Sequence, residues 1–358
     1  MESSNNGNNN QEKILMVKNL KTSFMTQNGE VQAIRGINFE LCKGDILGIV
    51  GESGSGKSVT SMSILQLLSD TAKIKEGEII FKGDNIVAFN KKQIRDIRGN
   101  KIAMVFQDPM SSLNPLMKVG EQIGEMIYVH NRDMKKQEIH EEVIRLMNLV
   151  RIPEPEKRVK SYPHQFSGGM RQRVMIAMAL ACKPDVLIAD EPTTALDVTI
   201  QDQILKLLKS LQAELGMSII FITHDLGVVA EICNKVIVMY GGLVMESALI
   251  DELFEKPSHP YTLGLLGSMP NIHQDKNTRL IPIKGIPPNM LKPPVGCPFA
   301  MRCTYARNIC DIKPPNYVDI NVNNKGSEHK SFCWLHDQEA PVDNNPFKNN
   351  SKGGATVC

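Results

Sequence analysis

The clearest chemistry in the sequence lies in the stretch GESGSGKS, from Gly51 to Ser58. Glycines at this spacing let backbone N–H groups surround phosphate oxygens, while a lysine reaches the β- and γ-phosphates and the final hydroxyl can ligate Mg²⁺. An apolar run precedes the stretch and a helical pattern follows it, which is the context this chemistry requires. The residues that we predict to bind the phosphates of a nucleotide are Gly51, Ser53, Gly54, Ser55, Gly56, Lys57 and Ser58.

A second constellation, DVLIADEP, places two acids at the end of an apolar run. Asp190 closes the expected strand, where a carboxylate can join the Mg²⁺ shell of a bound nucleotide. Glu191 follows directly and can orient or deprotonate an attacking water. Together with the phosphate-binding stretch, this pair predicts a nucleotide hydrolase.

A third stretch, FSGGMRQ at 166–172, raises a question about its ligand. A Ser-Gly-Gly turn that opens a helix offers free backbone N–H groups and the positive end of the helix dipole to an anion. The chain already has a phosphate cradle more than 100 residues earlier. One nucleotide does not need two cradles so far apart in sequence.

Four cysteines form a fourth group, Cys297, Cys303, Cys310 and Cys333, within a segment rich in proline. Such a segment cannot build a core of its own, so a metal that folds it is one explanation. Zinc sites usually contain close C-x2-C pairs, which this spacing lacks. Thiols that bind no metal, or that form disulfides, would also account for the group.

Composition narrows the class of protein. The 358 residues are 42% hydrophobic and carry a net charge of +2, so no general basic surface for nucleic acid is expected. No apolar run approaches the roughly 20 residues that span a bilayer. The first residues, MESSNNGNNNQEK, lack the apolar core of a signal peptide, and we expect a cytosolic protein.

The elements that position these groups alternate between short β-branched runs and longer helical patterns. This texture over 13–270 predicts an α/β domain with a largely parallel sheet. Residues from about 108 to 182 read mainly as helix and predict an inserted helical subdomain. Proline-rich sequence at 271–337 predicts a small irregular domain with the four cysteines, and polar tails at 1–12 and 338–358 are expected to be disordered.

The order of these motifs resembles that of the ABC ATPases. Ser167, Gly168 and Gly169 match the signature sequence of that family, and the motifs VFQDP with Gln107, ALD with Asp197 and ITHD with His224 stand at corresponding places. The resemblance implies an ABC-type P-loop ATPase fold that pairs head to tail with a second ATPase subunit. The second cradle would then serve the partner's nucleotide.

The same resemblance implies roles for individual residues. Glu191, His224 and Gln107 would be catalytic, and Ser58, Gln107 and Asp190 would hold Mg²⁺. Phe24 stands where the family places an aromatic ring that stacks on adenine. The residues that would contact the partner's ATP are Ser167, Gly168, Gly169, Gln172 and Asp197.

Four further stretches resemble the peptide-and-nickel branch of the family: MSSLNPLMKVGEQI, MRQRVMIAMALAC, TTALDVTIQDQIL and KPSHPYTLGLL. The resemblance implies an ATPase subunit that energises uptake of oligopeptides or dipeptides. Its partners would be a related but different ATPase chain, two permease subunits and an extracellular substrate-binding protein, and its place the cytoplasmic face of the membrane. A nickel or other small-solute importer, or an ABC ATPase of DNA repair or regulation, are the alternatives.

The resemblance also bears on Cys297, Cys303, Cys310 and Cys333. Relatives with a similar four-cysteine pattern are held to bind a [4Fe–4S] cluster, which four thiolates permit. The implied cofactors are therefore ATP, Mg²⁺ and a [4Fe–4S] cluster, with zinc as the alternative metal.

Overall fold

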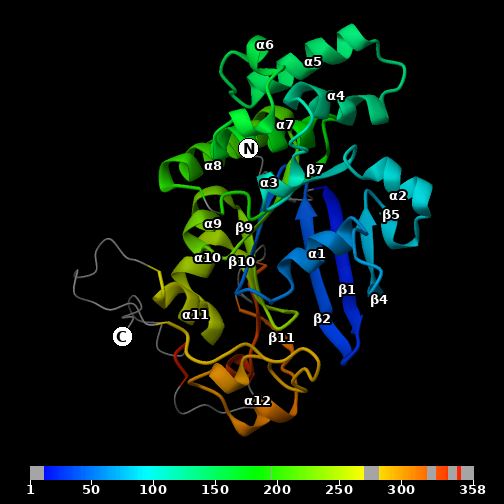
Figure 1. The fold of residues 1–358 in the computed structure, drawn as a ribbon. Coiled ribbons are helices and arrows are strands. Elements are labelled where there is room, and N and C mark those ends of the chain that lie inside the picture. The colour runs from blue at the N-terminus through cyan, green and yellow to red at the C-terminus, as the bar shows by residue number, and fades with distance from the viewer. Residues whose placement is uncertain (1–11, 195, 270–281, 321–327, 338–344, 348–358) are drawn as a thin grey trace, which may run out of the picture.

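The computed structural model describes residues 12–194, 196–269, 282–320, 328–337 and 345–347. The tails expected at 1–12 and 338–358 lie almost entirely outside the described residues. The described chain forms two β-sheets with helices packed around them (Figure 1). No helix among these residues has the length and apolar character needed to cross a membrane.

The smaller sheet is antiparallel and has the strand order β2-β1-β4-β5. A two-residue turn joins its long strands β1 and β2, where Thr26 pairs with Gly29. The sequence patterns did not predict this sheet. Its strands are β1 (Lys13–Thr26), β2 (Gly29–Cys42), β4 (Ala72–Phe81) and β5 (Asp84–Asn85).

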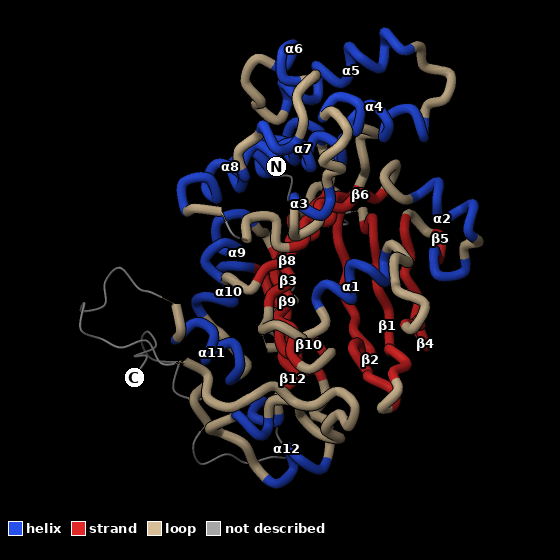
Figure 2. The backbone as a smooth tube through the Cα atoms, in the orientation of Figure 1, coloured by secondary structure: helices blue, strands red, loops and turns tan. Residues whose placement is uncertain are grey.

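The larger sheet has eight strands in the order β11-β12-β10-β9-β3-β8-β7-β6. Figure 2 shows the neighbouring strands β8, β3, β9, β10 and β12. The strands from β9 to β6 run parallel, as the sequence predicted, and the other three are antiparallel. The bounds are β3 (Ile46–Val50), β6 (Ile102–Val105), β7 (Val186–Asp190), β8 (Ser218–Thr223), β9 (Lys235–Tyr240), β10 (Leu243–Leu249), β11 (Tyr317–Asp319) and β12 (Lys330–Phe332).

Helices cover the larger sheet and extend beyond it. Figure 1 shows α4, α5 and α6 at the end of the molecule opposite α12. The α-helices are α1 (Lys57–Ile64), α2 (Lys91–Ile97), α3 (Pro109–Ser112), α4 (Val119–His130), α5 (Lys136–Leu149), α6 (Pro155–Arg158), α7 (Gly168–Leu180), α8 (Val198–Leu215), α9 (Leu226–Ile232), α10 (Ile250–Glu255), α11 (Pro260–Gly267) and α12 (Asn308–Ile312). Short 3-10 turns are η1 (Ile86–Ala88), η2 (Pro163–Gln165), η3 (Ala300–Arg302) and η4 (Trp334–His336).

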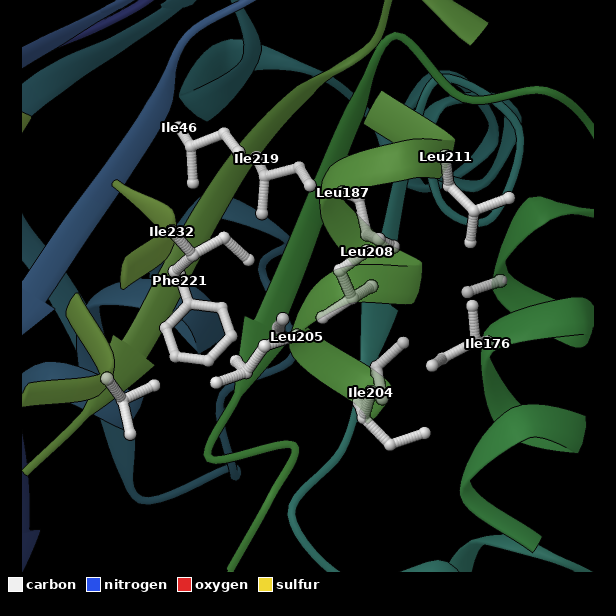
Figure 3. Packing of buried hydrophobic residues seen from close by; sticks show 14 of the residues in the cluster. Ile46, Ile176, Leu187, Ile204, Leu205, Leu208, Leu211, Ile219, Phe221 and Ile232 are labelled. Atoms are coloured by element: carbon white, nitrogen blue, oxygen red, sulfur yellow. The ribbon is translucent and has the colours of Figure 1, made fainter. Parts of the chain in front are cut away.

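The central strands are apolar on both faces because both faces are covered. On β8, Ile219 and Phe221 join the core on the α8 and α9 side, while Ile220 and Ile222 face the antiparallel sheet. Leu205 and Leu208 of α8 lie close to the strands in Figure 3. This double cover holds the carboxyl ends of the parallel strands in a fixed arrangement.

The segment between β6 and β7 is helical, with α3 to α7 in sequence order. Its buried residues, such as Ile123 of α4 and Leu146 of α5, belong to the same apolar cluster as the sheet strands.

The extension beyond α11 adds strands to the sheet. Ser331 and Lys330 of β12 pair with Glu246 and Ser247 of β10. Glu246 is fully buried and accepts hydrogen bonds from the Ser258 and His259 backbone N–H groups at 2.6 and 2.9 Å. Its Oε1 also lies 2.8 Å from Nε2 of His329. Buried polar contacts therefore tie the extension to the part of the chain that precedes it.

Candidate functional site

The predicted phosphate loop connects β3 with α1, and the side chain of its lysine is hydrogen-bonded to the loop backbone. Lys57 is 6% exposed, and its Nζ donates to the carbonyl oxygens of Gly51 at 2.7 Å and Glu52 at 3.1 Å. Burial lowers the pKa of Lys57, while the nearby carboxylates Glu191 and Asp190 raise it. The ammonium group thus stands at the loop, where a phosphate could replace the carbonyl partners.

Two loop positions require glycine. A Cβ on Gly51 would lie 2.2 Å from the Met239 carbonyl oxygen, and one on Gly56, at φ +103°, would lie 2.8 Å from that of Ala33. The loop backbone is therefore tightly packed against the neighbouring backbone at these two positions. The hydroxyl of Ser55, 3% exposed, has no hydrogen-bond partner among the described residues. These features fit a bound polyphosphate.

Asp190 ends β7 next to the first turn of α1. The Ser58 hydroxyl donates to Asp190 Oδ1 at 3.2 Å. Burial and the neighbouring Glu191 raise the pKa of Asp190, against the opposing effects of Ser58 and Lys57. The Ser58 hydroxyl and the Asp190 carboxylate are thus adjacent, and both are oxygen groups of the kind that Mg²⁺ prefers.

Glu191 is the centre of a small hydrogen-bonded group. Its Oε2 accepts from Gln107 Nε2 and from the Thr194 hydroxyl, both at 2.9 Å. Its Oε1 lies 3.4 Å from His224 Nδ1. The backbone of Glu191 is left-handed, with φ +46°, a strained conformation that is common at functional sites.

These side chains converge because of the sheet topology. Gln107, Glu191 and His224 follow β6, β7 and β8, which are adjacent and parallel. The carboxyl ends of parallel strands meet at one edge, which is the usual place for ligands in open α/β sheets. The structure therefore brings together the three residues that the resemblance implied to be catalytic.

Sequence reasoning missed Thr194, which lies three residues after Glu191. The only signal was its place in the EPTT segment that follows the acidic strand. Its hydroxyl takes one lone pair of Oε2 and so fixes the orientation of the carboxylate. The site consequently holds Glu191 from three directions.

The side chains of Ser167 and Asp197 cap helices that are separate from the phosphate loop. Ser167 caps α7 by accepting from Met170 N–H at 3.4 Å, and Asp197 caps α8 by accepting from Ile200 N–H at 3.0 Å. Gly168 borders Leu196, which precedes Asp197. Ser167, Gly168 and Asp197 lie at the protein surface, so the two helix N-termini form one surface.

Gly169 and Gln172 are buried, whereas Ser167 and Gly168 are exposed. A Cβ on Gly169 would lie 2.6 Å from Cγ2 of Ile200, so this glycine allows α7 and α8 to approach. Gln172 is 1% exposed, because it falls on the inner face of α7. The prediction that Gln172 contacts a partner's nucleotide does not fit this placement.

Phe24 lies half-buried on β1, between Val31 of β2 and Ala72 of β4. Its strand is linked to α1 by a 3.0 Å hydrogen bond between the Thr22 and Ser63 hydroxyls. The antiparallel sheet therefore approaches the helix that follows the phosphate loop. Among the described residues, no hydrogen bond or aromatic ring contact joins Phe24 to the loop itself.

The four C-terminal cysteines surround one small cavity of about 20 Å³, together with Phe299 and Trp334. Burial raises the pKa of the Cys297 thiol to about 12 and that of Cys303 to about 11, and it also raises that of Cys333. The thiols are close enough to add to these shifts by mutual repulsion. The Cys297 N–H donates to the Cys310 carbonyl at 2.7 Å.

No disulfide joins the described cysteines. Within the described ranges, no three His, Cys, Asp or Glu side chains are placed so that they could hold a metal ion. A zinc ion needs all its sulfur ligands at about 2.3 Å from one centre, and this arrangement does not provide that. The thiols share a cavity without the spacing of a single-ion site.

Two family models match the chain. The ABC transporter model covers residues 34–194. The model described as the C-terminal region of oligopeptide/dipeptide transporters covers residues 245–310. The first includes the phosphate loop and Glu191, and the second includes three of the four clustered cysteines.

Known proteins are similar over most of the chain. The dipeptide transport ATP-binding protein DppD and the oligopeptide transport ATP-binding protein OppD of Bacillus subtilis are each 51% identical over 330 residues, which is 92% of this chain and 96% and 90% of theirs. The dimeric post-hydrolysis structure of the ATP-binding cassette MJ0796 with ADP and phosphate has a TM-score of 0.60 at 29% identity and covers 66% of this chain and 98% of that one. At this identity and coverage, the chain belongs to the ABC transporter family, among the ATP-binding proteins that carry the oligopeptide/dipeptide C-terminal region.

Proposed function

We propose that the chain is the ATP-hydrolysing subunit of an importer that takes up oligopeptides or dipeptides across the cell membrane. The observation that carries the proposal is the Glu191 carboxylate, which Gln107, Thr194 and His224 hold beside the phosphate loop. The peptide cargo rests on the relatives, which are named dipeptide and oligopeptide transport proteins.

Each residue of the site has a separate role in ATP hydrolysis. Lys57 and the loop N–H groups bind the phosphates, and Ser58, Asp190 and Gln107 would hold Mg²⁺, which neutralises phosphate charge. Glu191 orients the attacking water and takes its proton. We assign His224 to contact the γ-phosphate and Phe24 to stack on adenine.

The chain works as one half of a pair. Ser167, Gly168 and Asp197 are exposed, so they are available to a nucleotide held by a second ATPase subunit. The dimeric MJ0796 cassette supports such pairing. The partner that we propose is a related but different chain. Sedimentation of Glu191→Gln with that partner tests this: MgATP should convert the mixture to a heterodimer, and an added Ser167→Arg should prevent it.

The helices from about 108 to 182 form the subdomain that docks on the permease. Met110 and Leu116 there are 65% and 85% exposed, and exposed apolar side chains of this kind suit a protein interface. We propose two permease subunits as direct partners, an extracellular substrate-binding protein that acts through them, and a place at the cytoplasmic face of the membrane. Nucleic acid is not among the partners.

The cargo is tested by uptake in cells that carry either the wild-type chain or Glu191→Gln. We expect the variant to abolish uptake of a labelled tripeptide and to leave labelled nickel uptake unchanged. Loss of nickel uptake alone would assign the chain to a nickel importer. Retained uptake of both, with no permease recovered on purification, would favour an ATPase of repair or regulation.

The small C-terminal domain is proposed to hold a [4Fe–4S] cluster on Cys297, Cys303, Cys310 and Cys333. The proposal is supported by the donor set, since four thiols line one cavity and each iron of a cluster can take one thiolate. Anaerobic purification should give iron and acid-labile sulfide in equal amounts, and Cys303→Ser should lose both while Cys42→Ser keeps them. Zinc in place of iron, or equal iron in the two variants, would overturn the assignment.

A further inference from the structure

The second residue of the phosphate loop is held by an arginine of the C-terminal extension. Arg302 Nη1 donates to Glu52 Oε2 at 2.6 Å, and Nη2 donates to Oε1 at 3.0 Å. The Arg302 side chain is 5% exposed and that of Glu52 is 28% exposed. Two parallel, charge-assisted bonds fix both the distance and the orientation of this contact.

Arg302 is itself held firmly. Its Nε donates to the Lys284 carbonyl at 2.9 Å, Nη2 to the Ile283 carbonyl at 3.0 Å and Nη1 to the Tyr240 hydroxyl at 3.0 Å. All three guanidinium nitrogens therefore have partners, and those partners come from the extension and from β9. The guanidinium has no freedom to follow a moving loop, so it defines where Glu52 lies.

Glu52 connects this support to the phosphate-binding lysine. Its backbone N–H donates to the Tyr261 hydroxyl at 2.9 Å, and its carbonyl accepts from Lys57 Nζ at 3.1 Å. The Glu52 carboxylate also raises the pKa of Lys57, so its charge is felt at the phosphate site. Without Arg302, that carboxylate would be unpaired and would repel the phosphates of ATP.

The segment that precedes Arg302 also packs behind the loop. Pro287, Pro288 and Met290 line a small cavity with Ser53 and Gly54. Further along, the Met290 carbonyl accepts from Gln32 N–H at 3.0 Å and the Pro294 carbonyl accepts from Arg35 Nη2 at 2.6 Å. The extension thus spans from the phosphate loop to the antiparallel sheet.

We propose that Arg302 is a positioning residue of the nucleotide site, which sets the phosphate loop through Glu52 and makes the C-terminal extension a part of ATP binding. Arg302 acts through Glu52 and does not itself reach the nucleotide. The inference rests on the proposed ATPase activity, and it concerns the affinity for MgATP rather than the chemical step.

A double-mutant cycle on the full-length chain tests the proposal, with MgATP affinity by calorimetry and KM and kcat in the assembled transporter. Arg302→Gln should raise Kd and KM for MgATP about tenfold, as expected for loss of a charged hydrogen-bonded pair, with kcat nearly unchanged. Glu52→Gln should lower the affinity for MgATP less than Arg302→Gln does, because it also removes the negative charge that repels the phosphates. The double variant should match Glu52→Gln rather than add the two effects.

Lys284→Gln is the matched control, since it removes an exposed positive charge from the same segment, and it should bind MgATP like the wild type. Arg302→Lys keeps the positive charge but cannot form the two parallel hydrogen bonds to Glu52. Its Kd for MgATP should therefore lie between that of the wild type and that of Arg302→Gln. Unchanged MgATP affinity in a folded Arg302→Gln chain, or additive effects in the cycle, would overturn the inference. If Arg302→Gln fails to fold, Arg302→Lys and the double variant still decide. A wild-type chain that binds MgATP without hydrolysing it would refute the proposed activity instead.

Discussion

Glu191→Gln isolates the charge of one carboxylate from the shape of its site. Glutamine has nearly the same volume, and its amide oxygen can still accept from Gln107 and Thr194, which now contact Oε2 at 2.9 Å. The amide nitrogen would then face His224, where the carboxylate oxygen lies 3.4 Å away. The substitution therefore removes the base and leaves the surroundings in place.

The expected loss follows from that role. A positioned general base contributes about 10²- to 10⁴-fold to a rate, which corresponds to about 3 to 5 kcal/mol in the activation barrier. MgATP binding should persist or tighten, because the variant takes one negative charge away from the phosphates. We therefore expect kcat to fall by at least 100-fold while Kd for MgATP stays within a few-fold.

Phosphate release by the assembled transporter measures the first quantity, and calorimetry on the subunit measures the second. Glu255→Gln serves as an isosteric control, because Glu255 is exposed on α10, and it should leave both unchanged. Turnover of Glu191→Gln within threefold of the wild type would refute the assignment of the base. Loss of ATP binding in step with turnover would show that the carboxylate organises the site instead.

Three further predictions concern the loop, the sheet edge and the thiols. Gly51→Ala should abolish MgATP binding, because its Cβ would lie 2.2 Å from a backbone oxygen, whereas Gly267→Ala, with nothing within 4 Å, should bind normally in the same titration. Glu246→Ala should lower the free energy of unfolding in urea by about 3 kcal/mol or more, because it leaves buried N–H donors without acceptors. Its control, Glu76→Ala, loses an exposed ion pair and should lower that free energy by less than about 1 kcal/mol. Burial raises the pKa of the Cys303 thiol to about 11, and only the thiolate reacts with an alkylating agent. Alkylation of Cys303 in the folded, metal-free chain at pH 8 should therefore be about 100-fold slower than in urea, and its rate should rise with pH up to about 11. An alkylation rate that does not depend on folding would contradict the structure.

The ATP site could be predicted because short motifs determine its local backbone. The loop glycines and the strand that ends in Asp190 place Lys57, Ser58 and Asp190 without reference to distant sequence. Gln107 and His224 were assigned through the family resemblance alone. They meet at Glu191 because the parallel strands β6, β7 and β8 present their carboxyl ends at one edge of the sheet.

Other features depended on contacts that leave little trace in sequence. The antiparallel sheet had one local signal, the Asn28-Gly29 dipeptide at the end of the turn, but the strands around it contain register shifts that break the alternation of side chains. Helix α7 is buried on most sides, so periodicity could not tell that Gln172 points inward. Arg302 and Glu52 lie 250 residues apart, and the sequence around each of them gives no signal that they form a pair.

Trp334 gives the cysteine cavity an optical reporter of its own. It is the single tryptophan of the chain, it is 5% exposed, and it lines the cavity with the four thiols. Its indole N–H donates to the Lys313 carbonyl at 3.0 Å, which holds the ring in place. All tryptophan emission from the isolated subunit therefore arises beside that cavity. A group that fills it and absorbs at those wavelengths will quench the emission, so the state of the thiol site can be followed by fluorescence without a label.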